Sequence, residues 1–322
     1  MKRRTYCTAG GLALVVIYAA NASCLARPDV ARPRLLAHRG VHQTFACPDL
    51  DADTCTAACL VPPTTDLLEN TIASMRAAFA LGADVVELDI HPTTDGELAV
   101  FHDWRLECRT NGSGVTREHS MRELQQLDIG YGYTADGGKT FPFRGKGIGL
   151  MPTLDQVLDT FPDRRFLIDI KSNEPGDGDA LARALLARPA AQRARLMVYG
   201  GDRPVERVLA LVPELRGLTK ARIKACVVRY EAIGWTGHVP DACRHAVLVL
   251  PRARARWLWG WPHRFIARMA AVDTDVFVVR GDGAYGFDDA AAFDEAADDS
   301  YSGGIWTDRI EVVGPAARRA SP

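Results

Sequence analysis

Eight short apolar runs alternate with stretches of helical periodicity along this chain, and this alternation constrains its fold more than any other feature. The runs are typical of β-strands and cover residues 35–38, 84–90, 165–171, 195–199, 215–218, 246–250, 275–279 and 304–307. Most are continuously apolar, as in Val-Val-Glu-Leu-Asp-Ile, which is typical of parallel strands buried on both faces. Helices are predicted between them, at 67–81, 179–187, 204–211, 221–233, 262–271 and 289–297.

Eight such units predict an α/β protein, a (β/α)8 TIM barrel over residues 33–315. An open, doubly wound sheet is the alternative, but no glycine-rich phosphate loop follows the first strand. Residues 42–66 are polar with three cysteines, and we expect a long loop after the first strand. Residues 103–150 are glycine-rich with a short helix near 121–127, and we expect an insertion after the second strand and an extra strand at 97–101. Loops at the carboxyl ends of barrel strands build active sites.

The N-terminus has the pattern of a secretory signal, which we assign to residues 1–26. Three basic residues at 2–4 precede an apolar run at 9–20 and then small residues. The run is too short to span a bilayer comfortably, so we expect cleavage and a secreted or periplasmic protein. An uncleaved N-terminal anchor and lipidation of Cys24 are the alternatives, although Asn21 stands where a lipidation motif usually has Leu.

Six cysteines remain beyond residue 26, an even number that suits disulfides in an oxidising compartment. We expect Cys226 to pair with Cys243 across one loop, Cys55 with Cys108 beside the active-site face, and Cys47 with Cys59. A zinc site is the rival interpretation, but neither a CxxC pair nor a matching histidine spacing is present. The formal net charge of −1 argues against nucleic acid as a partner.

Charged residues inside the apolar strands are the strongest functional signal. Glu87 and Asp89 alternate on one strand, so both point to one face near its carboxyl end, and Asp169 and Lys171 repeat this spacing on the third strand. Clustered carboxylates repel one another unless a cation compensates them, and three of them suit a hard divalent ion such as Mg²⁺ or Ca²⁺. A buried ion-pair layer around Lys171 is the purely structural alternative.

Two histidines are placed at the same barrel mouth. His38 ends the first strand, and His102 follows the extra strand. Histidine suits proton transfer near neutral pH, so the pair is a candidate acid and base. Arg39 can bind a phosphate through two nitrogens, and Lys171 can neutralise it as a point charge.

The order of these motifs resembles the glycerophosphodiester phosphodiesterase family. The similar segments are His38-Arg39-Gly40, Glu69-Asn70-Thr71, Glu87-Leu88-Asp89, His102-Asp103, Arg109-Thr110-Asn111-Gly112, Pro152-Thr153-Leu154 and Thr307-Asp308-Arg309. One tripeptide alone is weak evidence, but the ordered set over roughly residues 35 to 310 is specific.

The resemblance implies hydrolysis of small glycerophosphodiesters to an alcohol and sn-glycerol 3-phosphate, with a divalent cation. By matched position, Glu87, Asp89 and Asp169 would hold the metal, and Glu69 would lie in the same acidic cluster as a further ligand or an orienting group. His38 and His102 would be the acid and base, and Arg39 and Lys171 would contact the phosphate. The family usually has Glu where this chain has Asp169, which puts the identity and affinity of the metal in question.

Three other interpretations compete with this one. A lysophospholipase D or phospholipase-like enzyme would act on membrane lipids, and the tryptophans and arginines of Arg252–Met269 suit peripheral membrane contact. A packed barrel helix with solvated arginines would also explain that segment. A non-catalytic phosphodiester-binding protein would fit the altered Asp169, although both histidines are retained. A disulfide-stabilised structural protein would have no reason to cluster carboxylates inside a barrel.

Overall fold

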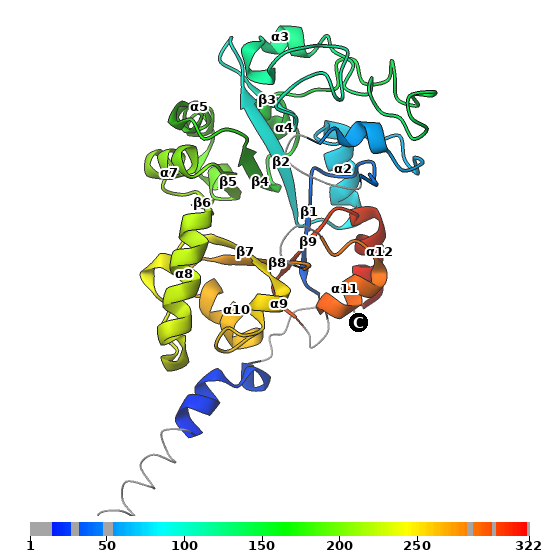
Figure 1. The fold of residues 1–322 in the computed structure, drawn as a ribbon. Helices are drawn as coiled ribbons and strands as arrows, with labels where there is room; N and C mark the ends of the chain where they lie inside the picture. The colour runs from blue at the N-terminus through cyan, green and yellow to red at the C-terminus, as the bar shows by residue number, and fades with distance from the viewer. Residues whose placement is uncertain (1–14, 27–31, 48–53, 282–285, 298–300, 321–322) are drawn as a thin grey trace, which may run out of the picture.

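The eight predicted strands form one parallel sheet that curls into a nearly closed barrel (Figure 1). The computed structural model describes residues 15–26, 32–47, 54–281, 286–297 and 301–320. The strands are β1 (Arg34–Ala37), β2 (Val85–Pro92), β4 (Arg165–Ile170), β5 (Leu196–Gly200), β6 (Arg216–Gly217), β7 (Val247–Pro251), β8 (Asp275–Val279) and β9 (Gly304–Thr307). Their order is β6-β5-β4-β2-β1-β9-β8-β7, and a parallel bridge between Gly217 and Ala246 joins the two ends. The predicted TIM barrel is therefore confirmed.

The extra strand predicted after β2 is present as β3 (Leu98–Val100), which pairs with β2 in antiparallel orientation. The register between β2 and β4 matters most for function, because it sets Asp89 directly opposite Asp169. Side chains that alternate on neighbouring strands then share a face, so the inward carboxylates of the two strands lie next to one another.

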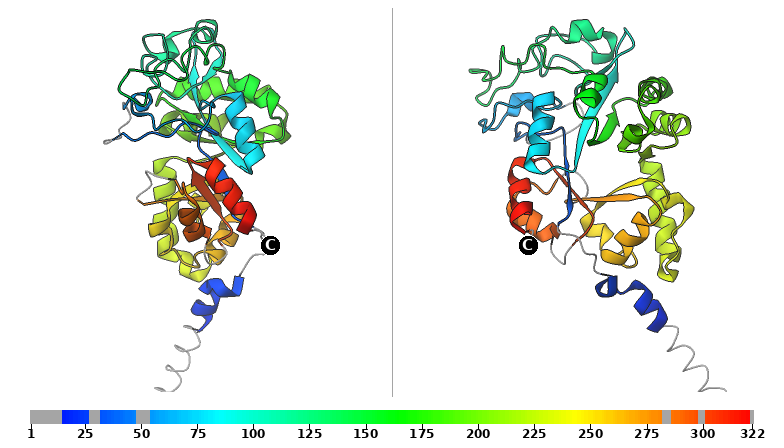
Figure 2. Two further views of the ribbon diagram at one scale, coloured as in Figure 1. Left: turned by 90° about the vertical axis from the view of Figure 1, so that its right-hand side faces the viewer. Right: turned by 180° about the vertical axis from the view of Figure 1, so that it is seen from behind.

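Helices surround the strands on the outside, as the two further views make plain (Figure 2). They include α2 (Ile72–Leu81), α4 (Leu154–Thr160), α5 (Pro175–Leu186), α7 (Asp202–Leu211), α8 (Lys220–Ile233), α10 (His263–Ala270), α11 (Ala290–Ala297) and α12 (Ile310–Ala320). The sequence did not predict α12, and α5 begins four residues before its predicted start.

The first predicted helix starts five residues too early, and the reason is local. Asn70 has a positive φ of 59°, which no helix accommodates, and the side chain of Thr71 accepts a hydrogen bond from the backbone N–H of Ser74. The helix therefore begins at Ile72, and Glu69 and Asn70 stay in the loop above the barrel mouth.

The insertion and the first βα loop share a small hydrophobic core of their own beside the barrel. Leu60 and Leu68 of the loop pack in one cluster with Leu106, Tyr133 and Phe143 of the insertion. Within the insertion, α3 (Met121–Leu124) is the short helix that the sequence predicted.

All three expected disulfides are present and confirmed. They join Cys47 to Cys59, Cys55 to Cys108 and Cys226 to Cys243, with Cα atoms 5.4, 5.4 and 4.7 Å apart. The second of these fastens the first loop to the insertion across 53 residues of chain.

The amino end of the barrel is closed by an ion cluster. Asp275, which is 5% exposed, accepts hydrogen bonds from Arg34, from Arg165 at 2.7 Å and from Arg216 at 2.6 Å. Burial raises the pKa of Asp275, but the three guanidinium groups outweigh burial and hold it below its usual value.

The basic start of the expected signal segment lies outside the described residues. Residues 20–23 do contact the barrel: Arg268 donates to the carbonyl oxygen of Ala20, and the Ser23 hydroxyl accepts from the backbone N–H of His263. No helix among the described residues has the length and apolar character needed to cross a membrane.

Candidate active site

Three carboxylates from two adjacent strands meet at the carboxyl end of the barrel. Glu87 and Asp89 of β2 and Asp169 of β4 are 0%, 1% and 8% exposed, and one oxygen atom from each lies within 4.8 Å of the others. The sequence predicted this group from the spacing of Glu87 and Asp89, and the β2–β4 register brings Asp169 to it. Three negative charges in such a small buried volume require compensation.

Two cations provide part of that compensation. The Lys171 ammonium lies 3.2 Å from Asp89 Oδ1 and 3.1 Å from Asp169 Oδ2, and Arg39 Nε lies 3.1 Å from Asp89 Oδ2. Among the described residues, no lysine or arginine side chain pairs with Glu87. Its Oε1 accepts a hydrogen bond of 2.7 Å from the Tyr199 hydroxyl, and its Oε2 accepts one of 3.1 Å from the backbone N–H of Arg39. The alternative of a buried ion-pair layer therefore applies to Asp89 and Asp169, whereas Glu87 lacks a lysine or arginine side chain as its partner among the described residues.

The electrostatics of the group favour a further positive charge. Burial and the neighbouring Asp89 raise the pKa of Glu87 well above its usual value. Burial also raises the pKa of Asp169, to about 6, although Lys171 acts in the opposite direction. Asp89 Oδ1 is buried and accepts no hydrogen bond from the described residues, although it lies 3.2 Å from the Lys171 ammonium. Three buried carboxylates, of which Glu87 lacks a lysine or arginine side chain as its partner, form an all-oxygen group that fits a hard divalent cation such as Mg²⁺ or Ca²⁺.

Each predicted catalytic histidine is held by a carboxylate through its Nδ1 atom. His38 Nδ1 lies 2.7 Å from Asp308 Oδ1, and His102 Nδ1 lies 2.7 Å from Asp103 Oδ1. Nε2 is therefore the nitrogen of each ring that is not bound to an aspartate, and Nε2 of His38 lies 3.7 Å from Glu87 Oε2. Burial, assisted by the charge of Arg39, lowers the pKa of both histidines.

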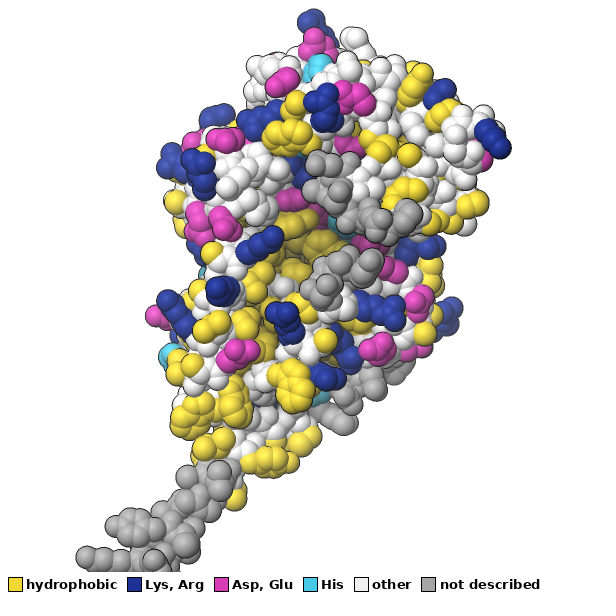
Figure 3. All heavy atoms as spheres, viewed as in Figure 1, with side chains coloured by type: hydrophobic (Ala, Val, Ile, Leu, Met, Phe, Trp, Pro, Cys, Tyr) yellow, Lys and Arg dark blue, Asp and Glu magenta, His cyan; other side chains and the backbone are white. Residues whose placement is uncertain are grey.

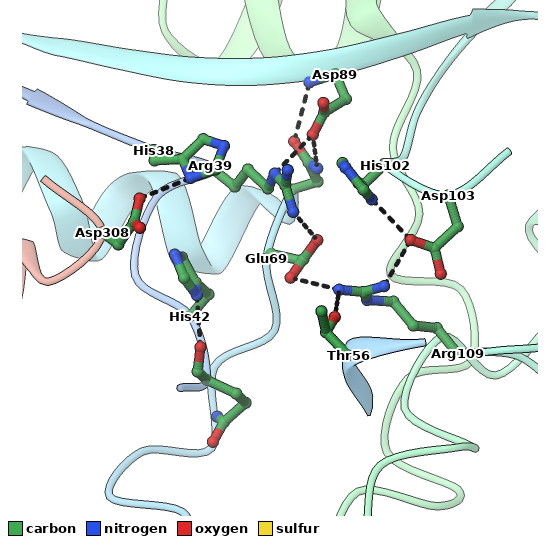
Figure 4. A network of polar contacts seen from close by, with 12 residues as sticks. His38, Arg39, His42, Thr56, Glu69, Asp89, His102, Asp103, Arg109 and Asp308 are labelled. Carbon is green, nitrogen blue, oxygen red and sulfur yellow. Dashed lines mark hydrogen bonds and ion pairs between the residues drawn. The ribbon is translucent and has the colours of Figure 1, made fainter. Parts of the chain in front are cut away.

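Glu69 lies apart from the three-carboxylate group and is already paired. Its Oε1 lies 3.2 Å from Arg39 Nη1 and its Oε2 lies 3.2 Å from Arg109 Nη2, while Arg109 also binds Asp103 at 2.5 Å (Figure 4). The chain Arg39–Glu69–Arg109–Asp103 thus links the arginine at the carboxylates to the partner of His102. Of the two roles expected for Glu69, this geometry matches the orienting one.

Sequence reasoning assigned no role to four residues that complete the site. Asp103, Arg109 and Asp308 stand inside motifs that were recognised, but nothing in those motifs says which atoms they contact. Tyr199 carried no signal at all, since a single tyrosine at the end of an apolar strand is common. The loop residue Asn70 also contributes, because its Nδ2 donates to Asp89 Oδ2 at 2.8 Å.

A cavity of about 600 Å³ opens beside the second histidine. Its lining includes His102, Asp103, Trp104, Glu107 and the disulfide of Cys55 and Cys108. Figure 3 shows the same face of the molecule as Figure 1, with a hollow between two lobes. The cavity has room for a group attached to a phosphate held at the carboxylates.

Comparison with known proteins agrees with the order of the motifs. Residues 38–193 match the model of the Glycerophosphoryl diester phosphodiesterase family, and this stretch includes both histidines and all three clustered carboxylates. This part of the chain, just under half of its length, is similar to that family. The barrel strands β5 to β9, with Tyr199 and Asp308, lie outside the matched stretch.

Curated relatives match about a third of the chain. A glycerophosphodiester phosphodiesterase of Caldanaerobacter subterraneus subsp. tengcongensis is 37% identical over 122 residues, which are 36% of this chain and 46% of that protein. A lysophospholipase D of Mus musculus is 32% identical over 110 residues, which are 33% of each. The chain thus spans less than half the length of either relative in these matches.

Solved structures of the family extend the likeness to nearly the whole fold. A glycerophosphodiester phosphodiesterase from Agrobacterium tumefaciens is 24% identical with a TM-score of 0.56, covering 88% of this chain and 99% of that one. An Oleispira antarctica phosphodiesterase in complex with the product sn-glycerol-3-phosphate is 17% identical with a TM-score of 0.54, covering 88% and 96%. At these identities the likeness concerns the fold.

Proposed function

We propose that the protein hydrolyses glycerophosphodiesters to an alcohol and sn-glycerol 3-phosphate, with a divalent cation and a histidine acid–base pair. One observation carries the proposal: two histidines, each fixed by a carboxylate on Nδ1, flank a buried three-carboxylate group. The family match and the product complex of the Oleispira antarctica phosphodiesterase support the same substrate class.

Glu87, Asp89 and Asp169 would hold the cation. A divalent cation bound there polarises the phosphoryl oxygens and offsets the charge that develops during displacement. Asp169 is one methylene shorter than the Glu usual in the family, so its carboxylate depends on Lys171, 3.1 Å away, for its position. The release assay described below distinguishes Mg²⁺ from Ca²⁺.

Nε2 of each of the two histidines is the atom that accepts or donates a proton. The lowered pKa favours the neutral form of each ring near pH 7. One neutral ring accepts a proton from the nucleophile, which is water or a hydroxyl of the substrate. The other ring donates a proton to the leaving alcohol and is supported in its charged form by its aspartate. Arg39 and Lys171 lie beside the carboxylates where a phosphate would bind, and both attract its oxygens.

The proposal is tested by release of glycerol 3-phosphate from a panel of diesters. The panel contains glycerophosphocholine, glycerophosphoethanolamine and glycerophosphoglycerol, each assayed with EDTA, Mg²⁺ or Ca²⁺. We expect release that requires a cation. A folded protein that releases no glycerol 3-phosphate from any of them would contradict the proposal.

A second substrate class, lysophospholipids at a membrane surface, is favoured by the exposed tryptophans. Trp257 is 76% exposed and Trp259 is 40% exposed in the segment that precedes α10, and Trp235 of the 3-10 helix Gly234–Thr236 is 40% exposed. Tryptophan beside arginine suits the interface of a bilayer. We therefore propose peripheral membrane contact through Arg252–Met269, in a secreted or periplasmic protein whose first 26 residues direct its export.

Vesicles test this second proposal directly. Wild type and the W257A/W259A variant would be sedimented with anionic phospholipid vesicles and assayed on glycerophosphocholine and on lysophosphatidylcholine. Membrane contact predicts that the variant loses sedimentation and turnover of the lipid but keeps turnover of the soluble diester. Equal sedimentation of both proteins would reject the contact.

A further inference from the structure

His42 is a buried histidine that the reaction does not use. It follows Val41 in the first βα loop and is 9% exposed. Its Nδ1 lies 2.6 Å from the carbonyl oxygen of Gln43, which can only accept a hydrogen bond, so Nδ1 carries the proton. Nε2 therefore holds a lone pair, and it has no hydrogen-bond partner among the described residues. A buried acceptor without a donor carries a free-energy cost that a ligand at this position would remove.

His42 stands in a second group of possible metal ligands, together with His38 and Asp308. His38, His42 and Asp308 each offer one ligand atom, and these three atoms lie within 4.8 Å of one another. Figure 4 shows the His42 ring beside the His38–Asp308 pair. A further carboxylate adds negative charge here, since Asp288 Oδ1 accepts from the backbone N–H of Asp308 at 2.7 Å.

We propose that His38, His42 and Asp308 form a second metal site, separate from the three-carboxylate group, and that this site takes zinc. Two imidazole nitrogens and one carboxylate oxygen, with an open fourth position, are a donor set that zinc favours. Mg²⁺ and Ca²⁺ prefer oxygen ligands alone and belong at Glu87, Asp89 and Asp169. Metal-binding histidines commonly donate their other N–H to a backbone carbonyl, as His42 does to Gln43.

Zinc in this site would block the histidine that it binds. Zn²⁺ on Nδ1 of His38 takes the place of the proton shared with Asp308, and that proton passes through solvent to Nε2. The ring stays neutral, but Nε2 now carries hydrogen and cannot accept another proton. Zinc is therefore an inhibitor that competes with neither Mg²⁺ nor Ca²⁺. This consequence rests on the proposed function, whereas binding of zinc does not.

A binding experiment tests the site without any assay of activity. Wild type, H42Q and a control variant, H238Q, are titrated with Zn²⁺ by calorimetry in saturating Mg²⁺ or Ca²⁺. His238 is an exposed histidine outside the site, so its loss reports on adventitious surface binding. We expect H42Q to weaken zinc by at least roughly 100-fold, because losing only an outer-shell partner already costs 10–100-fold. H238Q should bind as wild type does.

Cobalt provides a second measurement. Co²⁺ bound by two imidazoles and a carboxylate absorbs visible light, and we expect this absorption in wild type and in H238Q but not in H42Q. If H42Q fails to fold, as judged by circular dichroism, D308N takes its place, because Asn retains the shape of Asp308 but provides a weaker ligand. Zinc affinity equal to wild type in a folded H42Q or D308N protein would overturn the site.

Turnover then decides the inhibitory role. H42Q should retain most of its activity in Mg²⁺ or Ca²⁺ and resist zinc concentrations that inhibit wild type and H238Q. If zinc binds wild type at this site but leaves its turnover unchanged, the proposed inhibitory role of zinc is wrong. Absence of phosphodiesterase activity in every sample would count against the proposed function alone, since the calorimetric result still decides the metal site.

Discussion

His38 and Asp308 are joined by a hydrogen bond of 2.7 Å between Nδ1 and Oδ1, although 270 residues separate them in the chain. The contact exists because β1 and β9 are neighbours in the barrel and both end at its mouth, with Ala37 opposite Thr307. It fixes the ring of His38 so that Nε2 faces the carboxylates, and it couples the matched part of the chain to the unmatched C-terminal strands.

Loss of this contact should slow turnover more than it weakens substrate binding. For D308N we expect kcat to fall by roughly 10²–10⁴-fold with little change in KM, because an amide at this position favours the wrong tautomer of the histidine. Steady-state kinetics on a soluble diester measures both constants. D289N is the control, since Asp289 carries an exposed side chain next in sequence to Asp288. A D308N protein with normal kcat would show that Asp308 does not contribute to turnover.

Removal of either histidine should lower kcat by roughly 10²–10⁴-fold, the usual contribution of an acid or base. H38A and H102A are compared with H119A, whose half-buried ring binds the carbonyl oxygen of Ser113. Single-turnover rates with saturating cation separate chemistry from product release. If both active-site variants turn over at a near-normal rate, the acid–base assignment is wrong.

Neutralisation of Glu87 should weaken binding of the cation. E87Q keeps the hydrogen bond from Tyr199 but removes a charge from the three-carboxylate group, so we expect cation affinity to fall at least about tenfold, as for the loss of a single outer-shell partner. Equilibrium dialysis with Mn²⁺, read by electron spin resonance, measures affinity without activity. D169E restores the residue usual in the family and should bind the cation as tightly as wild type or more tightly. Full activity of wild-type protein that has been verified as metal-free would show that the reaction does not require the cation.

Asp275 should make the protein sensitive to acid at the opposite end of the barrel. Its folded pKa lies below its unfolded value of about 3.9, so its contribution to stability is present above pH 3.9 and is lost as pH falls through the folded pKa. D275N leaves three arginines without their shared carboxylate and should lower the free energy of unfolding by about 3–5 kcal/mol. Urea denaturation at pH 7 and pH 3 measures both effects. The variant should lose less stability than wild type between these pH values, and an equal loss would contradict the role.

The disulfide between Cys55 and Cys108 should stabilise both the fold and the site. Its loop of 53 residues predicts about 4 kcal/mol from chain entropy alone. The same link positions Thr56, whose hydroxyl lies 2.7 Å from Arg109 Nη2. We expect C55S/C108S to lower the melting temperature and to reduce kcat, with the C226S/C243S variant affecting only the melting temperature. An unchanged kcat in C55S/C108S would show that the disulfide does not position the catalytic residues.

The strands of this fold were predictable because burial leaves a direct trace in sequence. Each of the eight predicted runs overlaps an observed strand, since parallel strands covered on both faces must be continuously apolar. Helix starts were less predictable, as the late start of α2 shows, because a positive φ at Asn70 leaves no reliable mark in composition. The helix α12 was missed because Gly314 and Pro315 interrupt its sequence.

The sequence by itself determined the barrel, the two histidines and the carboxylates of Glu87 and Asp89, because these depend on periodicities within single strands. Only the tertiary structure decided the partners: Asp308 for His38, Tyr199 for Glu87, and the pairing of Glu69 with Arg39 and Arg109. The physical reason is that a hydrogen bond between distant segments depends on strand order and register. Strand order and register are determined by the packing of the whole sheet, and a local pattern of residues does not encode them.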